Sequence, residues 1–382
     1  MNMDFIINDG CLEKYIGNGG EITIPDEVYE IAPQAFENCN SIVSVTIPDS
    51  VVSIGEFAFA ECSNLESVKL PSDITEISDG LFVGCTKLQN VNVPYGVTDI
   101  GSRAFSWCQS LKSIELPDSV RRIGACAFNT CSCLEKIHLY DWVTFIGEQA
   151  FAYCNSLKSV TIPAGFTFVD TNAFISCRNL ESVTIPEGSV HLGFGAFAGC
   201  ERLKSVSVDE SVDFADERIF QGCPGLADEN GFVIVNNVLF DYFGRKSVVS
   251  IPEGVACISD GAFEKQDWIK EVKIPDSVSK IGECAFERCE GMADESGFVI
   301  VRDSLQGYYG DSSVVVVPDG VATISNYAFA FNFNVSEIYI PDSVSYIGED
   351  AFFGCDDITV HASANSYAAE YAEENYMGFV CE

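Results

Sequence analysis

Basic residues are scarce in this sequence. Lys and Arg together number 21 against 57 Asp and Glu, which gives the 382 residues a net charge of -36 at pH 7. A protein with this charge repels the phosphates of nucleic acids and the anionic lipids of a membrane surface. We therefore expect no nucleic-acid partner.

Long hydrophobic runs are missing as well. No apolar stretch approaches the roughly 18 residues that would indicate a membrane-spanning helix, and residues 1–9 lack the basic and then apolar pattern of a secretory signal. Hydrophobic residues nevertheless make up 47% of the sequence and charged residues only 20%, which is enough apolar material for a buried core. We expect a folded, soluble protein that does not insert into a membrane.

Histidine is too rare to favour catalysis. The three histidines, His138, His191 and His361, occupy positions that vary along the chain, and such positions are typical of solvated side chains rather than of a catalytic triad. The many carboxylates leave a glycosidase pair as a remote alternative, because some will lie at a catalytic separation by chance. We expect no catalytic residue, no enzyme activity and no cofactor.

The sequence does contain a period of 23 residues. Phenylalanine recurs at this interval, usually after alanine, and the series continues after two longer steps of 43 residues. Such a period is the mark of a repeat architecture. The phenylalanines that define thirteen units are Phe36, Phe59, Phe82, Phe105, Phe128, Phe151, Phe174, Phe197, Phe220, Phe263, Phe286, Phe329 and Phe352.

One unit, residues 85–105, gives the pattern a physical meaning. Val91 and Val93 alternate with polar residues, which predicts a strand with one buried face, and Pro94 ends it by removing an amide donor. Apolar residues then recur at spacings of three or four up to Phe105, which predicts tight bends and one short helical turn. Because no turn can bury its own apolar stripe, neighbouring turns must stack. We predict a β-rich α/β repeat solenoid of about 13 turns, with a parallel sheet on the concave side.

A second unit of 20 residues occurs three times, starting at Phe5, Phe232 and Phe298, each with a glycine twelve residues later. An apolar strand and a two-residue turn predict a β-hairpin in each copy, although Arg302-Asp303 suits such a turn poorly. Since one copy opens the chain, we expect the hairpin to cover the first turn and to embellish the solenoid at the other two places.

These units predict one domain spanning residues 1–382. It comprises a hairpin module at 1–25, repeats over 26–360 with hairpin modules at 232–252 and 298–318, and a C-terminal cap at 361–382. Residues 366–375 of the cap have the composition of a short helix.

Cysteine is abundant, but its positions favour packing over chemistry. Eleven of the 17 cysteines stand three residues after the repeated Phe, where a small buried residue is needed at every turn. No Cys-x-x-Cys zinc spacing is present. We expect these eleven thiols, at 39, 62, 85, 108, 131, 154, 177, 200, 223, 289 and 355, to be buried and reduced.

An acidic residue follows the strand in ten of the thirteen units. A stacked row of carboxylates could attract calcium, but one acid per turn does not converge the six to eight oxygens that calcium requires, so turn formation and solubility explain the row better. We expect no metal site. The row consists of Asp26, Asp49, Asp118, Asp141, Glu187, Glu210, Glu253, Asp276, Asp319 and Asp342.

The repeat resembles that of the BspA-type leucine-rich repeat proteins. The match is clearest at Leu111, Ile114, Leu116, Pro117, Val120, Ile123, Gly124, Ala127, Phe128 and Cys131. The resemblance covers roughly residues 20 to 360, and the tail around Tyr367 and Tyr371 also looks like the terminal segment of that family. It implies a right-handed solenoid that acts in adhesion and recognition at bacterial or protist surfaces, and it implies no particular ligand.

The sequence departs from this pattern at four places. Tyr140 and Asp209 replace the proline that ends the strand, and Gln266 and Asn332 replace the cysteine. We expect these turns to pack less regularly.

The polar positions of the strands are the candidate binding site. Small hydroxyl side chains dominate both ends of this row, whereas its middle carries both charge signs and longer side chains. Aromatic anchors are scarce there, so we expect weak, polar and multivalent contact with a protein or glycan ligand. A merely solvated strand face explains the row about equally well. The candidate residues are Lys69, Asn90, Asn92, Glu115, Lys136 and His138.

Two functions remain open from the sequence. One is a surface or secreted recognition module, which the resemblance implies, and the other is a cytoplasmic interaction scaffold, which the many unpaired thiols favour. In either case we expect a monomer.

Overall fold

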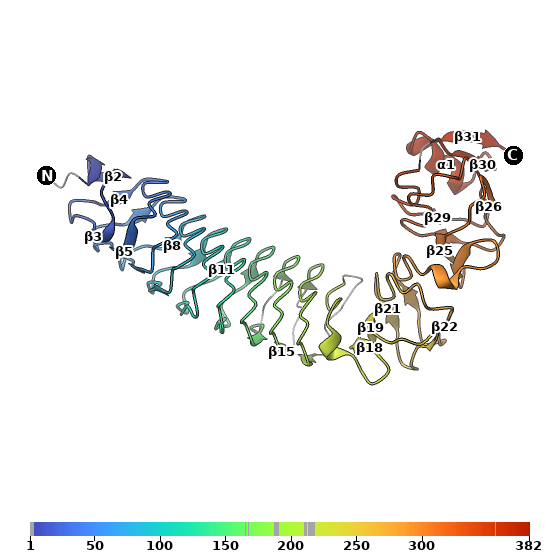
Figure 1. Ribbon diagram of the computed structural model, residues 1–382, viewed down its shortest axis with the longest axis horizontal. Coiled ribbons are helices and arrows are strands. Elements are labelled where there is room, and N and C mark those ends of the chain that lie inside the picture. Colours follow the sequence, from blue (N-terminus) through green and yellow to red (C-terminus); the bar gives the residue numbers. More distant parts are fainter. Residues whose placement is uncertain are drawn as a thin grey trace. The chain divides into compact units, whose positions relative to one another are not determined.

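A computed structural model describes residues 4–164, 166, 168–186, 191–209, 212, 218–355 and 357–382. The chain forms two compact units, Met1–Ala227 and Asp228–Glu382 (Figure 1). Both are stacks of short turns with parallel sheets. That residues 1–382 behave as one continuous domain stays a prediction.

In the N-terminal unit, the predicted strands stack in parallel with a register of one repeat, so that Ser44 pairs with Ser67 and Ser67 with Asn90. We call this stack the first ladder. It is not continuous, because between its two sheets only an isolated bridge, from Ser113 to Lys136, occurs. Its strands are β3 (Gly20–Thr23), β5 (Ile42–Thr46), β7 (Ser67–Lys69) and β9 (Asn90–Val91), then β13 (Ser159–Thr161), β15 (Ser182–Ile185) and β17 (Ser205–Val208).

A second parallel stack runs along the same unit, where the sequence predicted only tight bends. We call it the second ladder. Its two-residue strands pair through the repeated isoleucine position, as in Ile77 with Ile100 and Ile100 with Ile123. Strands this short cannot display a period of two, so they could not be recognised in the sequence. They are β4 (Glu30–Ile31), β6 (Ser53–Ile54), β8 (Glu76–Ile77), β10 (Asp99–Ile100), β11 (Arg122–Ile123), β12 (Phe145–Ile146), β14 (Phe168–Val169) and β16 (His191–Leu192).

The segment around each Phe is not the predicted helical turn. Its alternate backbone N–H groups donate to the next turn of the solenoid, as from Phe105 to the carbonyl of Ala127 at 2.8 Å. To reach that geometry, the residues two before and two after the Phe adopt left-handed conformations, with φ of 57° at Arg103 and 64° at Trp107. The third side of each turn is therefore also held by hydrogen bonds between repeats.

In the N-terminal unit, the Phe side chains form a stack from Phe36 to Phe220. The rings of Phe105, Phe128 and Phe151 lie 5.2 Å apart, centroid to centroid, and are nearly parallel. The predicted cysteine column packs beside them and is buried at nine of its eleven positions and partly buried at Cys39 and Cys355. The expectation of burial is confirmed at these nine positions, where no disulfide is formed in the structure, and the reduced state stays a prediction.

All three predicted hairpins are present, including the one whose turn begins at Arg302, which takes a φ of 59°. Their role differs from the predicted embellishment. The second strand of each hairpin pairs with the second ladder, and its final tyrosine packs against the next Phe of the core, with 5.4 Å between the centroids of Tyr15 and Phe36. Each module thus forms a turn of its own. The strands are β1 (Phe5–Asn8) with β2 (Cys11–Tyr15), β18 (Phe232–Val235) with β19 (Val238–Tyr242), and β24 (Phe298–Val301) with β25 (Ser304–Tyr308).

The solenoid accordingly has about 16 turns rather than about 13. The glycine that stands twelve residues after the first Phe of each module is required for a steric reason. A Cβ at Gly244 or Gly310 would overlap the ring of Tyr242 or Tyr308 two residues earlier.

The C-terminal unit repeats both ladders, and each of its two hairpins begins a new sheet. Short 3-10 helices, η1 (Pro224–Leu226) and η2 (Glu290–Met292), occur before the two hairpins in sequence. The first-ladder strands of this unit are β20 (Val248–Ser250), β22 (Glu271–Lys273), β26 (Val314–Val316), β28 (Glu337–Tyr339), β30 (Thr359–Ala362) and β31 (Gly378–Cys381). Those of the second ladder are β21 (Cys257–Ile258), β23 (Lys280–Ile281), β27 (Thr323–Ile324) and β29 (Tyr346–Ile347).

The predicted terminal helix is α1 (Tyr367–Glu374). The Ser366 hydroxyl caps it by accepting a hydrogen bond from the N–H of Ala369, and Tyr371 packs against Phe352, the last Phe of the core, at 6.0 Å. Strand β31 then pairs with β30. The cap therefore covers the apolar end of the last repeat.

Candidate functional site

Two of the predicted site residues, Lys69 and Asn90, lie in paired strands of the first ladder. Lys69 ends β7 opposite Thr46, and Asn90 begins β9 opposite Ser67. Both side chains are exposed. Because paired strands stand roughly 4.8 Å apart, side chains at one position form a closely spaced row across the turns.

Asn92 is exposed but is not free. Its Oδ1 accepts a hydrogen bond from the N–H of Leu70 at 3.0 Å. In other turns, such as that of Ile47, the corresponding N–H donates to a main-chain carbonyl of the next repeat. The Asn92 side chain thus replaces backbone pairing where the first ladder becomes irregular, and Val91 and Val93 are only partly buried there.

The remaining candidates lie in the irregular part of the first ladder. Glu115, Lys136 and His138 are all exposed, and only Lys136 takes part in backbone pairing, through the bridge to Ser113. The His138 ring meets the ring of Tyr140 edge-on, with the centroids 4.3 Å apart.

Aromatic side chains near this site were underestimated from the sequence. Tyr140, which replaces the strand-ending proline, is 37% exposed, and Trp142 is 62% exposed with the guanidinium of Arg121 over its ring at 5.7 Å. The Tyr140-Asp141-Trp142 sequence contains this signal, because two aromatic residues stand where the repeat has the proline that ends the strand and the residue two positions later. The expected scarcity of aromatic anchors holds for the row itself but not for its border.

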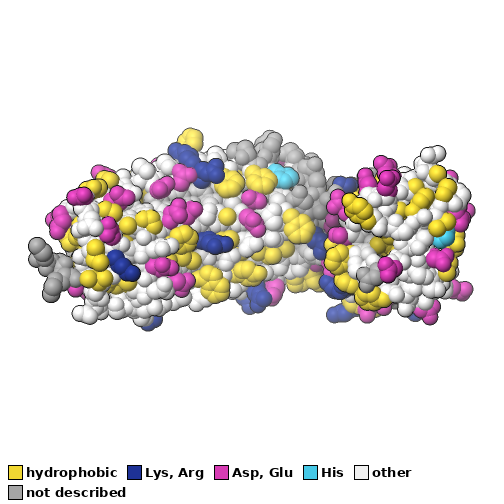
Figure 2. Space-filling model, turned by 90° about the horizontal axis from the view of Figure 1, so that it is seen from above, with side chains coloured by type: hydrophobic (Ala, Val, Ile, Leu, Met, Phe, Trp, Pro, Cys, Tyr) yellow, Lys and Arg dark blue, Asp and Glu magenta, His cyan; other side chains and the backbone are white. Residues whose placement is uncertain are grey.

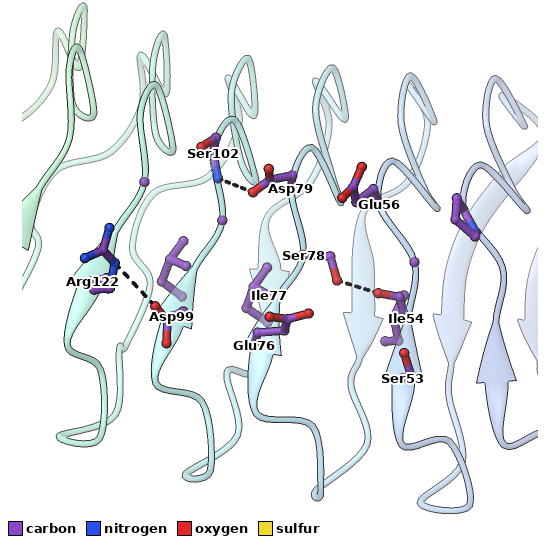
Figure 3. A pocket seen from close by; sticks show the side chains of 15 residues that line it. Ser53, Ile54, Glu56, Glu76, Ile77, Ser78, Asp79, Asp99, Ser102 and Arg122 are labelled. Carbon is purple, nitrogen blue, oxygen red and sulfur yellow. Dashed lines mark hydrogen bonds and ion pairs between the residues drawn. The ribbon is translucent and has the colours of Figure 1, made fainter.

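The sequence also missed a groove along the second ladder (Figure 3). It crosses consecutive turns, has a volume of about 670 Å³ and is lined by residues of β6, β8, β10 and β11 and of the bends that follow them. Four of these residues are acidic: Glu56, Glu76, Asp79 and Asp99.

Two of the four carboxylates are already engaged. Asp79 accepts a hydrogen bond from the N–H of Ser102 at 2.7 Å, and Asp99 forms an ion pair with Arg122 at 3.6 Å. Glu56 and Glu76 are exposed at the groove. The groove therefore offers negative charge to a positively charged or hydroxyl-rich partner. Acidic side chains are also spread over the face seen in Figure 2.

The second ladder continues into a row of aromatic and charged side chains. The guanidinium of Arg122 lies 4.7 Å from the ring centroid of Phe145, and Phe168 stacks on His191 at 5.2 Å. Such contacts between adjacent turns fix the orientation of partly exposed side chains.

The residues that the structure describes form no evident metal site. No group of three or more His, Cys, Asp or Glu residues among them could hold a metal ion. In the acidic row, Asp49 accepts a hydrogen bond from the N–H of Ser72 at 2.9 Å, whereas Glu187 and Glu210 lie outside the described residues.

One histidine is not solvated as expected. The His361 side chain is only 11% exposed, stacks on Tyr339 at 4.2 Å and lies between the carboxylates of Glu337 and Glu382, each 3.4 Å away. These contacts link β28, β30 and the residue after β31.

The two cysteine replacements, Gln266 and Asn332, do not leave loosely bonded turns. The thiols of the column donate to the carbonyl of a Phe in the preceding turn, as Cys154 does to Phe128 at 3.2 Å. After an internal hairpin an amide takes over this task, and Gln266 donates to the carbonyl of Tyr242 at 2.8 Å and Asn332 to that of Gly310 at 3.4 Å. Both substitutions therefore preserve a hydrogen bond to the turn before.

Comparison with known proteins agrees with the architecture. The model of the BspA type leucine rich repeat region matches residues 6–117, 98–227, 229–294 and 307–371. No curated protein matches the chain. Within the described residues, no helix is long and apolar enough to cross a membrane.

Three bacterial crystal structures are similar in fold. A leucine rich cell surface protein from Faecalibacterium prausnitzii is 29% identical over 76% of this chain and 92% of its own, with a TM-score of 0.45. A leucine-rich repeat protein from Bacteroides ovatus is 22% identical over 99% of this chain and 100% of its own, with a TM-score of 0.38. The T. pallidum leucine rich repeat protein is 31% identical over 53% of this chain and 89% of its own, with a TM-score of 0.41.

Proposed function

Because the chain belongs to the BspA-type leucine-rich repeat family, we propose that it is a non-enzymatic recognition protein that binds a protein or glycan ligand through the outward face of its first ladder. The observation that carries the proposal is that side chains of successive repeats lie in register where the ladder is regular, Lys69 beside Thr46 and Asn90 beside Ser67. Such a row can match an extended or repetitive ligand at several points.

The binding region is the stretch from Lys69 to Lys136 and His138, with Asn90 and Glu115 between them. Regular strand pairing stops after β9 in this stretch and resumes at β13. Longer side chains of both charge signs replace the small hydroxyls of the flanking turns. Asn92 shapes this region through its bond to Leu70. Tyr140 and Trp142, at the border, are suited to anchor a partner, because exposed aromatic side chains contribute strongly to binding.

The test compares wild-type protein with the variant Lys69→Ala, Glu115→Ala, His138→Ala. Both are applied to immobilised collagen, laminin and mucin and to an array of immobilised glycans. We expect wild type to bind at least one of these surfaces and the triple variant to bind it at least tenfold more weakly, with an unchanged thermal midpoint.

A matched control carries the same residue types off the row: Lys87→Ala, Glu148→Ala, His191→Ala, all exposed in the wild type. If the control variant binds as weakly as the first variant, or if the first variant binds as tightly as wild type, the binding site does not lie on the first ladder.

For location, we propose the cell surface or a secreted form, with a cytoplasmic scaffold as the alternative. The support is the family and the Faecalibacterium relative described as a cell surface protein. Labelling of intact producing cells with a membrane-impermeant reagent should modify this chain. Labelling only after lysis would favour the cytoplasmic alternative.

A further inference from the structure

A cluster of exposed aromatic rings marks the C-terminal unit. Phe331 and Phe333 are 53% and 74% exposed, and Tyr327 and Phe353 are exposed beside them. The ring of Phe353 stands nearly perpendicular to those of Tyr327 and Phe331, with centroids 6.1 and 5.4 Å away. Exposed apolar clusters of this kind are unfavourable in water and are typical of binding sites.

The rings border a hollow of about 740 Å³, within the range of roughly 300–1,000 Å³ found for small-ligand sites. Its other walls combine apolar and polar residues. The polar lining includes the exposed Asn334 and Arg288, whose guanidinium forms an ion pair with Glu287 at 3.6 Å, whereas the Asn332 amide is engaged with Gly310. Tyr327 is held in place, because its hydroxyl donates to the carboxylate of Asp350 at 2.9 Å.

We propose that this hollow binds a neutral oligosaccharide. Aromatic rings favour the C–H faces of sugar rings, while amides and paired ions can exchange hydrogen bonds with sugar hydroxyls. The net charge of -36 disfavours an anionic ligand, and it also disfavours a second copy of the chain. The volume suits a few sugar units rather than a protein face, which typically buries about 800 Å² on each partner.

The test uses hexaoses of glucose, mannose, xylose and N-acetylglucosamine, with binding measured by isothermal titration calorimetry and by saturation-transfer NMR. Wild type should bind at least one of them. The variant Phe331→Ala, Phe333→Ala should bind it at least tenfold more weakly and keep the wild-type thermal midpoint, because both side chains are exposed. The control Tyr95→Ala, Phe194→Ala removes two exposed rings of the other unit and should bind as wild type.

This site is separate from the first-ladder row, so the variant Lys69→Ala, Glu115→Ala, His138→Ala should bind the hexaose normally. If no hexaose binds, or if the Phe331 and Phe333 variant binds undiminished, the proposal is wrong. It is equally wrong if wild type forms a dimer in sedimentation analysis that this variant abolishes, since the occupant is then a second copy.

Discussion

Each column cysteine does more than fill space. Cys154 is fully buried, and its thiol lies 3.2 Å from the carbonyl oxygen of Phe128 in the preceding turn. The period and the residue type predicted burial. They could not predict the hydrogen bond, because the acceptor comes from another turn whose distance the sequence does not contain. The acceptors of the Gln266 and Asn332 amides could not be predicted from the sequence either, because they also come from another turn.

Comparison of Cys154→Ser with Cys154→Ala tests this role. In an apolar site, a buried hydroxyl without a partner costs about 1–3 kcal/mol. Because the carbonyl of Phe128 can accept from serine, we expect the serine variant to be no less stable than the alanine variant in urea denaturation. The serine variant could instead be less stable than the alanine variant by more than about 1 kcal/mol, the usual size of such a bond. The Cys154 side chain would then stabilise the fold through apolar packing alone.

The buried thiols also predict how stability depends on pH. Burial raises the pKa of Cys62, Cys177 and Cys289 from an ordinary value near 9 to about 12. Below pH 9 these thiols are neutral in both the folded and the unfolded chain, so their contribution to the free energy of unfolding does not change with pH. Between about pH 9 and 12 they ionise only in the unfolded chain, so stability falls by up to about 1.4 kcal/mol per pH unit for each thiol.

Urea denaturation at pH 8, 9.5 and 10.5 measures this effect. The free energy of unfolding should drop from each pH to the next, and less steeply in the variant Cys62→Ala, Cys177→Ala. Identical slopes in the two proteins would contradict the assignment to these thiols.

At the scale of the element, the repeated strand and the hairpins were predictable because alternation and turn residues are local signals. The second ladder and the left-handed segments were not, because they depend on hydrogen bonds between turns. The unsuitable turn at Arg302 forms nonetheless, and its guanidinium donates to the carbonyl of Val278 at 2.8 Å, in an earlier turn. Contacts from beyond the hairpin thus offset a poor local preference.

The left-handed positions predict a stabilising substitution. Thr130 has a φ of 61°, which is unfavourable for a β-branched residue. Thr130→Gly should therefore raise the free energy of unfolding by about 1 kcal/mol. The control Thr46→Gly, at an exposed position of β5, should lower it by a similar amount. Destabilisation of both variants alike would show that packing of the Thr130 side chain outweighs its backbone strain.

For the whole molecule, we predict one cooperative domain and a monomer, although the chain divides into two compact units. Phe151→Ala and Phe263→Ala each remove a fully buried ring from a different unit and should each cost about 3–5 kcal/mol. In a single domain, either change shifts the same urea transition. Two transitions, each responding to only one variant, would indicate independent domains. Light scattering should give a mass near 41.5 kDa.

The candidate site was only partly predictable at this scale. The alternation of strand residues identified which side chains face outward, and Lys69, Asn90, Glu115, Lys136 and His138 are indeed exposed. The engagement of Asn92 with Leu70 and the groove beside β8 depend on how turns stack. No single repeat contains that information.

Site-specific photocrosslinking tests the central claim most directly. A photoreactive phenylalanine analogue replaces Asn90 on the first ladder or Glu76 on the second, both exposed in the wild type, and the protein is irradiated on whichever of collagen, laminin or mucin it binds. Recognition through the first ladder predicts a crosslink from position 90 and none from position 76. Crosslinking from position 76 alone, or from neither position while binding persists, would contradict it.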